Sequence, residues 1–123
     1  MSRSSLKLRT LAEQWIEAWN SRDLDRIMEH YAADIEFEAN TVVQRWQKPD
    51  GILRGVAELR DHFRRGLSLA PDLHFEIEDV FFAPSGYAVL YRRENGIRVL
   101  DVVELNAEGK AHRVKAFYLG RQE

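Results

Sequence analysis

The spacing of hydrophobic residues changes once along this chain, from a helical period in the first half to alternation in the second. Apolar residues recur every third or fourth position from Leu8 to Trp19 and again over about 56–69, which predicts two helices, and a shorter helix is expected after Asp23. A strand is expected at 35–39, and alternating strands fill the chain from residue 73 onward. Helices grouped before strands are typical of an α+β fold, with helices on one side of a mainly antiparallel sheet.

Turn signals divide the second half into strands. Pro84-Ser85-Gly86 and the segment 106–109 each separate two strands. Asn95-Gly96 lies between them and predicts a type I′ hairpin, because both residues tolerate positive φ. Upstream, Tyr31 is expected on the apolar face of the second helix.

Residues 41–54 show no sustained hydrophobic period and include the turn signal Pro49-Asp50-Gly51. The segment is therefore expected to be a long loop, and long loops in small domains often cover binding sites. Trp46 lies within it, and a lone tryptophan in such a loop is expected to cover the pocket.

Composition limits the class of protein. The 123 residues suffice for one domain, 1–123, and 45% are hydrophobic. A net charge of −2 and the lack of long apolar runs argue against a nucleic-acid or membrane partner. No cysteine is present and the four histidines lack metal-ligand spacing, so we expect no metal or cofactor. The charged N-terminus has no apolar signal region, which favours a cytoplasmic protein.

The expected strand at 98–105 carries one carboxylate on an otherwise apolar face. Asp101 alternates with Val99 and Val103 there, while Leu100 and Val102 make the opposite face apolar as well. Helices can cover only one face of the sheet, so the outer face is expected to pair two copies of the chain. The residues expected in this homodimer interface are Leu100, Val102, Phe117 and Leu119.

Several segments together resemble the nuclear transport factor 2-like superfamily, in its SnoaL-like polyketide cyclase and ketosteroid isomerase-like branch. They are WIEAWNSRDLDRIMEHYAADIEFE, the helix beginning after Gly55, the segment 71–75 and DVVELNAEGKAHRVKAFY. The resemblance implies a cone-shaped, cystatin-like α+β barrel, in which three N-terminal helices pack in the concave face of a strongly bent sheet beside an apolar cavity. It does not imply one reaction, because members include isomerases, cyclases, hydrolases and binding subunits.

Residue by residue, the resemblance retains one of three ketosteroid isomerase groups. It places Asp101 at the acid that holds an oxyanion, Trp15 at the assisting tyrosine and Ala39 at the base. Epoxide hydrolases related to this fold need an acid on each of their late strands, flanking an arginine. In this sequence the matching position on the final strand is Ala116. Steroid isomerase and epoxide hydrolase activity are therefore not carried over.

Two functions stay open at this point. One is a cofactor-free isomerase, cyclase or lyase acting on a small apolar carbonyl compound, with Asp101 as acid or oxyanion donor and Tyr118 or Asn40 assisting. The other is a non-catalytic ligand-binding or dimerisation module, favoured if an arginine such as Arg92 or Arg93 pairs with Asp101. The residues expected in the pocket wall are Trp15, Trp19, Tyr31, Phe37, Ala39, Trp46, Phe63, Val99, Val103, Val114 and Ala116.

Overall fold

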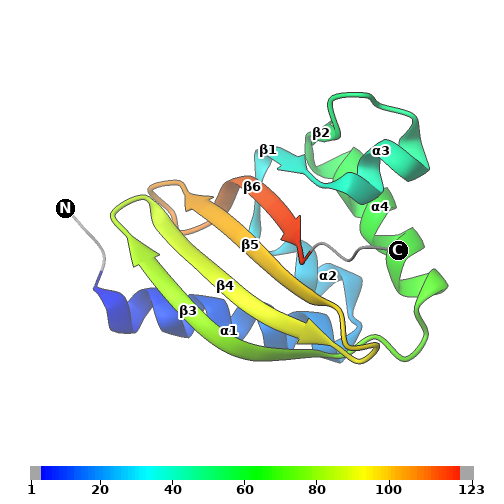
Figure 1. Ribbon diagram of the computed structural model, residues 1–123. Coiled ribbons are helices and arrows are strands. Elements are labelled where there is room, and N and C mark those ends of the chain that lie inside the picture. Colours follow the sequence, from blue (N-terminus) through cyan, green and yellow to red (C-terminus); the bar gives the residue numbers. More distant parts are fainter. Residues whose placement is uncertain (1–3, 120–123) are drawn as a thin grey trace.

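A six-stranded sheet and four helices make up the computed structural model, which describes residues 4–119 (Figure 1). The helices are α1 (Ser5–Ser21), α2 (Leu24–Met28), α3 (Asn40–Trp46) and α4 (Val56–Leu69). The strands are β1 (Tyr31–Glu38), β2 (Ile52–Arg54), β3 (Phe75–Ala83), β4 (Gly86–Arg93), β5 (Arg98–Leu105) and β6 (Ala111–Tyr118). None of the helices in this part of the chain is long and apolar enough to cross a membrane.

The sheet has the strand order β2-β1-β6-β5-β4-β3 and is antiparallel except between β1 and β6, which run parallel. It confirms the predicted α+β class with a mainly antiparallel, curved sheet. The sheet does not close, however, because β2 and β3 are its two edges, so the expected barrel is an open one. The register places Asp101 between Val89 on β4 and Ala116 on β6, on the face turned toward the helices.

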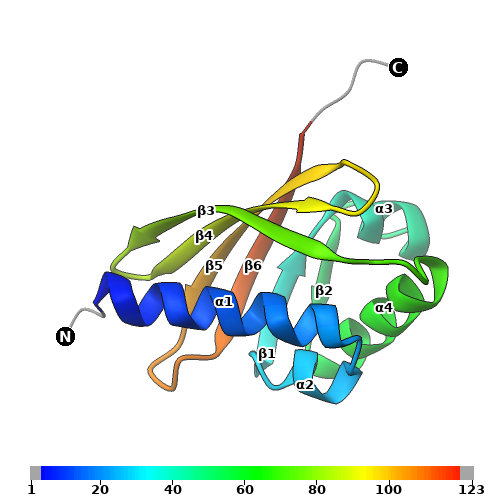
Figure 2. The ribbon, with the colours of Figure 1, turned by 90° about the horizontal axis from the view of Figure 1, so that it is seen from below.

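Helices cover this inner face in two places. Helix α1 packs along β3 and β4, and α4 packs against β1 and β2 (Figure 2). Side chains at the end of α1 fix the arrangement: Asn20 exchanges two hydrogen bonds with the backbone of Phe75, at 2.8 and 2.9 Å. Arg22 donates to the carbonyls of Leu67 and Ala70, which caps the C-terminus of α4.

The sequence predictions for α1, α2 and α4 are correct, and their N-terminal caps explain where two of them begin. The Ser4 hydroxyl accepts from the Lys7 N–H, and the Asp23 carboxylate accepts from the first turn of α2. Tyr31 was wrongly assigned to α2, since it is the first residue of β1.

The long loop predicted at 41–54 was wrong, because the segment contains α3 and β2. Helix α3 is only seven residues long and buries only Val42 fully, so no helical period is visible in its sequence. Its order comes from tertiary contacts, including a hydrogen bond from the Ala39 N–H to the Gly51 carbonyl. The hairpin at Asn95-Gly96 forms, but only Gly96 has a positive φ, so the turn is not type I′.

The outer face of the sheet carries an apolar strip. Val102 is 37% exposed and Phe117 is 52% exposed, and Leu100 is paired directly with Phe117 across the two strands. Leu119, expected in the same strip, instead lines the mouth of a cavity on the inner side. We propose that the strip, redefined as Leu100, Val102 and Phe117, pairs with a second copy of the chain.

Replacing Phe117 with glutamate should dissociate this homodimer, because it would bury a charge against an apolar surface. Light scattering on wild type should give about twice the chain mass of 14.4 kDa, and Phe117→Glu should give a single chain mass. Leu6→Glu, at an exposed position on α1, is the matched control and should stay dimeric. A wild-type monomer at micromolar concentration would contradict the proposal.

Candidate functional site

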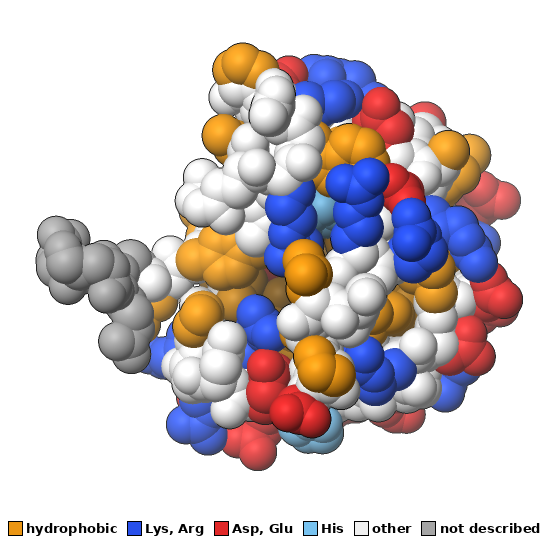
Figure 3. Space-filling view, turned by 90° about the vertical axis from the view of Figure 1, so that its right-hand side faces the viewer, with side chains coloured by type: hydrophobic (Ala, Val, Ile, Leu, Met, Phe, Trp, Pro, Cys, Tyr) orange, Lys and Arg blue, Asp and Glu red, His pale blue; other side chains and the backbone are white. Residues whose placement is uncertain are grey.

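A cavity of about 630 Å³ lies where α1 and α4 diverge beneath the sheet. Its lining comes from α1, α3, α4, β1, β3, β4, β5 and β6, so it is built from nearly the whole fold. Figure 3 shows a hollow on one face of the molecule, with hydrophobic side chains within it and Lys or Arg side chains at its edge. The size suits a small organic molecule.

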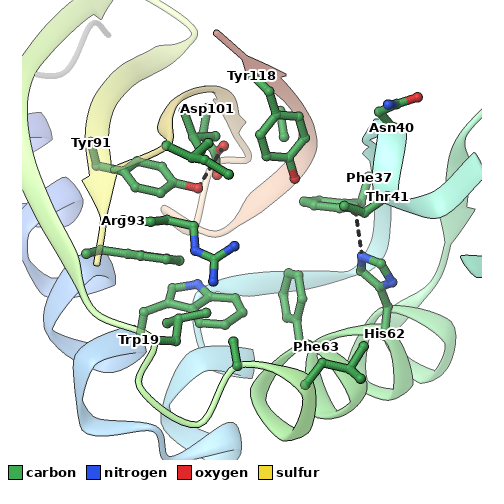
Figure 4. A pocket seen from close by; sticks show the side chains of 18 of the residues that line it. Trp19, Phe37, Asn40, Thr41, His62, Phe63, Tyr91, Arg93, Asp101 and Tyr118 are labelled. Carbon is green, nitrogen blue, oxygen red and sulfur yellow. Dashed lines mark hydrogen bonds between the residues drawn. The ribbon is translucent and has the colours of Figure 1, made fainter. Parts of the chain in front are cut away.

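Asp101 is the only carboxylate among the lining residues of the described chain, and it is 3% exposed. The Tyr91 hydroxyl donates to its Oδ1 at 3.4 Å, a long hydrogen bond (Figure 4). Burial raises the pKa of Asp101 to about 7, and the Tyr91 hydrogen bond opposes that rise. The wall of the cavity therefore holds a carboxyl group that is protonated in a large fraction of molecules near neutral pH.

Tyrosine hydroxyls surround this acid. Burial raises the pKa of Tyr31, Tyr87 and Tyr91, and the nearby Asp101 carboxylate raises each further. All three therefore remain neutral hydrogen-bonding groups. The Tyr31 hydroxyl accepts from the Trp15 indole N–H at 2.7 Å, which leaves its own proton available to another acceptor.

No arginine forms a salt bridge to Asp101 in the described residues. Arg92 lies on the outer face and pairs with Glu76 at 2.8 Å. Arg93 lies on the inner face and extends into the cavity, where its guanidinium pairs with Glu94 at 3.0 Å (Figure 4). Within residues 4–119, Asp101 therefore faces the cavity without a cationic partner.

A chain of hydrogen bonds reaches the opposite wall from α3 and α4. The Trp46 indole donates to Nδ1 of His62 at 3.0 Å, and Nε2 of His62 lies 3.3 Å from the Thr41 hydroxyl. Because indole N–H can only donate, Nδ1 must be unprotonated and His62 must carry its proton on Nε2. Burial, together with the nearby Arg45 and Arg65, lowers the pKa of His62 to about 4, so the ring is neutral.

These hydrogen bonds are donated in one direction, from Trp46 through His62 and Thr41 toward Tyr118. Since Thr41 accepts from His62, its own hydroxyl proton is available, and an interaction with Thr41 favours the ionised form of Tyr118. Burial has the larger effect and raises the pKa of Tyr118. Tyr118 thus stays protonated, with its hydroxyl turned toward Phe37 and Thr41 (Figure 4).

The structure brings most of the predicted site together. Asp101 and Tyr118 line the cavity, as do the predicted wall residues Trp15, Trp19, Tyr31, Phe37, Phe63, Val99 and Ala116. Asn40 lies at the rim, but it is exposed and its side chain points away from the cavity (Figure 4).

Four predicted wall residues lie outside the cavity. Trp46 packs behind His62 instead of covering the opening, because α3 turns its side chain toward α4. Ala39 is buried at the N-terminus of α3. Val103 and Val114 lie deeper, around a second, very small cavity of about 10 Å³ on the far side of Asp101.

Sequence reasoning missed Tyr91. It also left open whether Arg92 or Arg93 points into the pocket, and whether His62 faces the pocket or solvent. Alternation along β4 could have identified Tyr91 and Arg93, because Tyr87, Val89, Tyr91 and Arg93 share one face. His62 could not be placed in the same way, since its position depends on how α3 packs against α4. Residues 4–119 bring together no group of three acidic or histidine side chains that could hold a metal ion.

Comparison with known proteins supports the same class. The model of the SnoaL-like domain family matches residues 12–117. A SnoaL-like protein of unknown function from Burkholderia thailandensis is 31% identical over 98% of this chain and all of its own, with a TM-score of 0.93. No curated protein matches the chain significantly.

Two more distant structures share the fold. A SnoaL-like family protein from Agrobacterium tumefaciens, provisionally described as an isomerase, has a TM-score of 0.72 at 19% identity over 94% of this chain and 99% of its own. SalBIII, an epoxide hydrolase/cyclase-like enzyme of pyran ring formation in salinomycin, has a TM-score of 0.71 at 20% identity over 94% and 92%.

An open, curved sheet that holds a cavity against its helices defines a class of small α+β domains within the nuclear transport factor 2-like superfamily. The protein belongs to the SnoaL-like family of that superfamily.

The hydrogen bonds of His62 to Trp46 and Thr41 predict its tautomer, and its burial predicts a low pKa. Nitrogen-15 NMR should show His62 as the Nε2–H tautomer, with a pKa of about 4. Trp46→Phe should raise that pKa, because the donor that favours neutral Nδ1 is lost, and should cost about 1 kcal/mol of unfolding free energy. Since the unfolded histidine takes up a proton at about 6.5, the stability contributed by neutral His62 should be lost as pH falls from 6.5 toward 4. Titration of His62 near 6.5 in wild type would contradict this account.

Proposed function

We propose that this protein is a cofactor-free isomerase, cyclase or lyase that acts on a small, mainly apolar carbonyl compound. The observation that carries the proposal is Asp101, a buried carboxyl on the cavity wall with a pKa near 7 and no cationic partner among the described residues. Such a group can donate a hydrogen bond to a carbonyl oxygen and stabilise the negative charge that develops there.

The residues around Asp101 have separate roles in this proposal. Tyr91 donates to one carboxyl oxygen, so the acidic proton is directed to the other oxygen and toward a bound ligand. The aromatic side chains of Trp15, Trp19 and Phe63 supply apolar contact area. Tyr118, on the neighbouring strand β6, is a second neutral donor on the same inner face of the sheet. The apolar surroundings exclude water, which strengthens each hydrogen bond to the developing charge.

A second function has one observation in its favour. The positions of a further catalytic acid or base are occupied by Ala39 and Ala116, and Ala116 pairs directly with Asp101 across the strands. With one carboxyl in the cavity, the chain lacks an obvious separate proton acceptor. A non-catalytic ligand-binding or dimerisation module is therefore the alternative, and the titration of Asp101 separates the two.

We expect the Asp101 carboxyl to titrate near pH 7 by carbon-13 NMR. The unfolded carboxyl ionises near 4 and the folded one near 7, so raising the pH between these values favours the unfolded chain. Asp101→Asn removes this penalty and should be more stable than wild type above pH 7, by about 1–4 kcal/mol, and little different below pH 4. Thermal melts over this pH range measure the difference.

Asp79→Asn, which changes an exposed acid on β3, is the matched control and should leave the melting curve near that of wild type. A low pKa for Asp101, together with a destabilised Asp101→Asn, would indicate a structural acid and favour the binding module.

Binding of 2-naphthol tests the oxyanion role. Near neutral pH the free phenol is protonated, so its oxygen mimics an enolate only when its hydroxyl proton is shared with ionised Asp101. Wild type should therefore bind it more tightly as pH rises through about 7. Asp101→Asn should lose this pH dependence, whereas Asp79→Asn should retain it. Fluorescence titration of the naphthol measures both, and a pH-independent affinity in wild type would contradict the role.

A further inference from the structure

Arg93 is one of two arginines that line the cavity. It is the last residue of β4 and follows Tyr91 on the inner face, so its side chain extends over the cavity toward Trp19 (Figure 4). About a quarter of the side chain is exposed. An arginine at this position loses much of its hydration, and that loss must be offset by hydrogen bonds.

The described chain supplies hydrogen-bond acceptors for only some of the N–H groups of the Arg93 guanidinium. Glu94 accepts from Nη2 at 3.0 Å through one carboxylate oxygen, and its other oxygen accepts from the His74 backbone N–H, also at 3.0 Å. The Nε–H of Arg93 is buried and has no hydrogen-bond partner in the described chain. Buried donors without partners are rare in folded proteins, so Arg93 has hydrogen-bonding capacity that the described chain does not use.

A second donor lies in the same part of the cavity. The Trp19 indole N–H is also buried without a hydrogen-bond partner. It lies near the Tyr31 hydroxyl, which accepts from Trp15 at 2.7 Å and whose ionised form Trp19 also favours. Arg93 and Trp19 therefore both offer N–H groups and no acceptor.

The charge balance of the lining favours an anion. Two arginines, Arg45 and Arg93, line the cavity, and Glu94, which is not among the lining residues, pairs with Arg93. The only carboxyl in the described lining is Asp101, which is protonated in a large fraction of molecules at neutral pH. Along β4, Arg93 is four residues from Val89, the strand partner of Asp101, which corresponds to about 13 Å of backbone. A ligand can therefore contact Arg93 near the mouth and Asp101 in the wall at the same time.

We propose that the ligand is a carboxylate with an apolar body, whose carboxylate accepts hydrogen bonds from Arg93 near the mouth while its reacting oxygen lies at Asp101. A guanidinium donates in a planar fork that matches a carboxylate, and a single arginine suits one such group. Only one part of this inference, the position of the reacting oxygen at Asp101, rests on the proposed function. The carboxylate subsite depends on Arg93 and stands apart from the role of Asp101.

Three pairs of probes test the subsite: 2-naphthoate, benzoate and hexanoate, each compared with its neutral amide by calorimetry at pH 7.5. At least one carboxylate should bind wild type about tenfold or more tightly than its amide, with affinity that falls as salt is raised. Arg93→Met should remove that preference, and Arg93→Lys should retain part of it. Arg92→Met is the matched control, because Arg92 is the neighbouring arginine, is also paired with a glutamate and lies on the outer face.

The outcomes separate this inference from the proposed function. Loss of carboxylate preference in Arg93→Met but not in Arg92→Met supports the subsite, whatever the behaviour of 2-naphthol with Asp101→Asn. Failure of all three carboxylates to bind more tightly than their amides would overturn it, as would an unchanged preference in Arg93→Met. Should Arg93→Met fail to fold, the preference in Arg93→Lys decides: a preference that is reduced from wild type supports the subsite, and an affinity ratio unchanged from wild type overturns it.

Discussion

The inner face of the curved sheet is longer than the helices can cover, and this constraint shapes the rest of the protein. Helix α1 follows β3 and β4, while α4 follows β1 and β2 at the other edge. Asn20 and Arg22 fix the junction of these elements through backbone groups of β3 and α4. Between the two helices the inner surfaces of β5 and β6 remain uncovered, and the cavity occupies that space. A ligand site in this fold is thus a consequence of incomplete packing between helices and sheet.

Two titratable groups of the cavity, Asp101 and His62, are kept largely neutral by burial. Burial raises the pKa of Asp101 and lowers that of His62, so that neither group carries a full charge near neutral pH. Their effects on stability oppose each other between pH 4 and 7. Asp101 makes the folded state less favourable as pH rises, and His62 makes it more favourable. A flat pH profile of overall stability would therefore conceal two large contributions, and only single substitutions separate them.

Relatives of the same fold differ in what fills comparable positions. The epoxide hydrolase/cyclase-like SalBIII and this chain share about one residue in five, which establishes the fold and leaves the chemistry to the individual side chains. Here the cavity lining includes one buried acid, neutral tyrosines and the incompletely paired Arg93. These groups suit the proposed ligand, a mainly apolar molecule that carries carbonyl and carboxylate oxygens.

The sequence alone determined the fold class, three of the four helices and the inward position of Asp101, because hydrophobic period and alternation are local properties that survive in the tertiary structure. It could not reveal α3 or β2, since a helix of seven residues and a strand of three are stabilised by contacts with distant segments. The sequence also left open whether an arginine neutralises Asp101. Only the tertiary structure decided this, because Arg92 and Arg93 are adjacent in the chain and the pleat of β4 directs one to solvent and the other into the cavity.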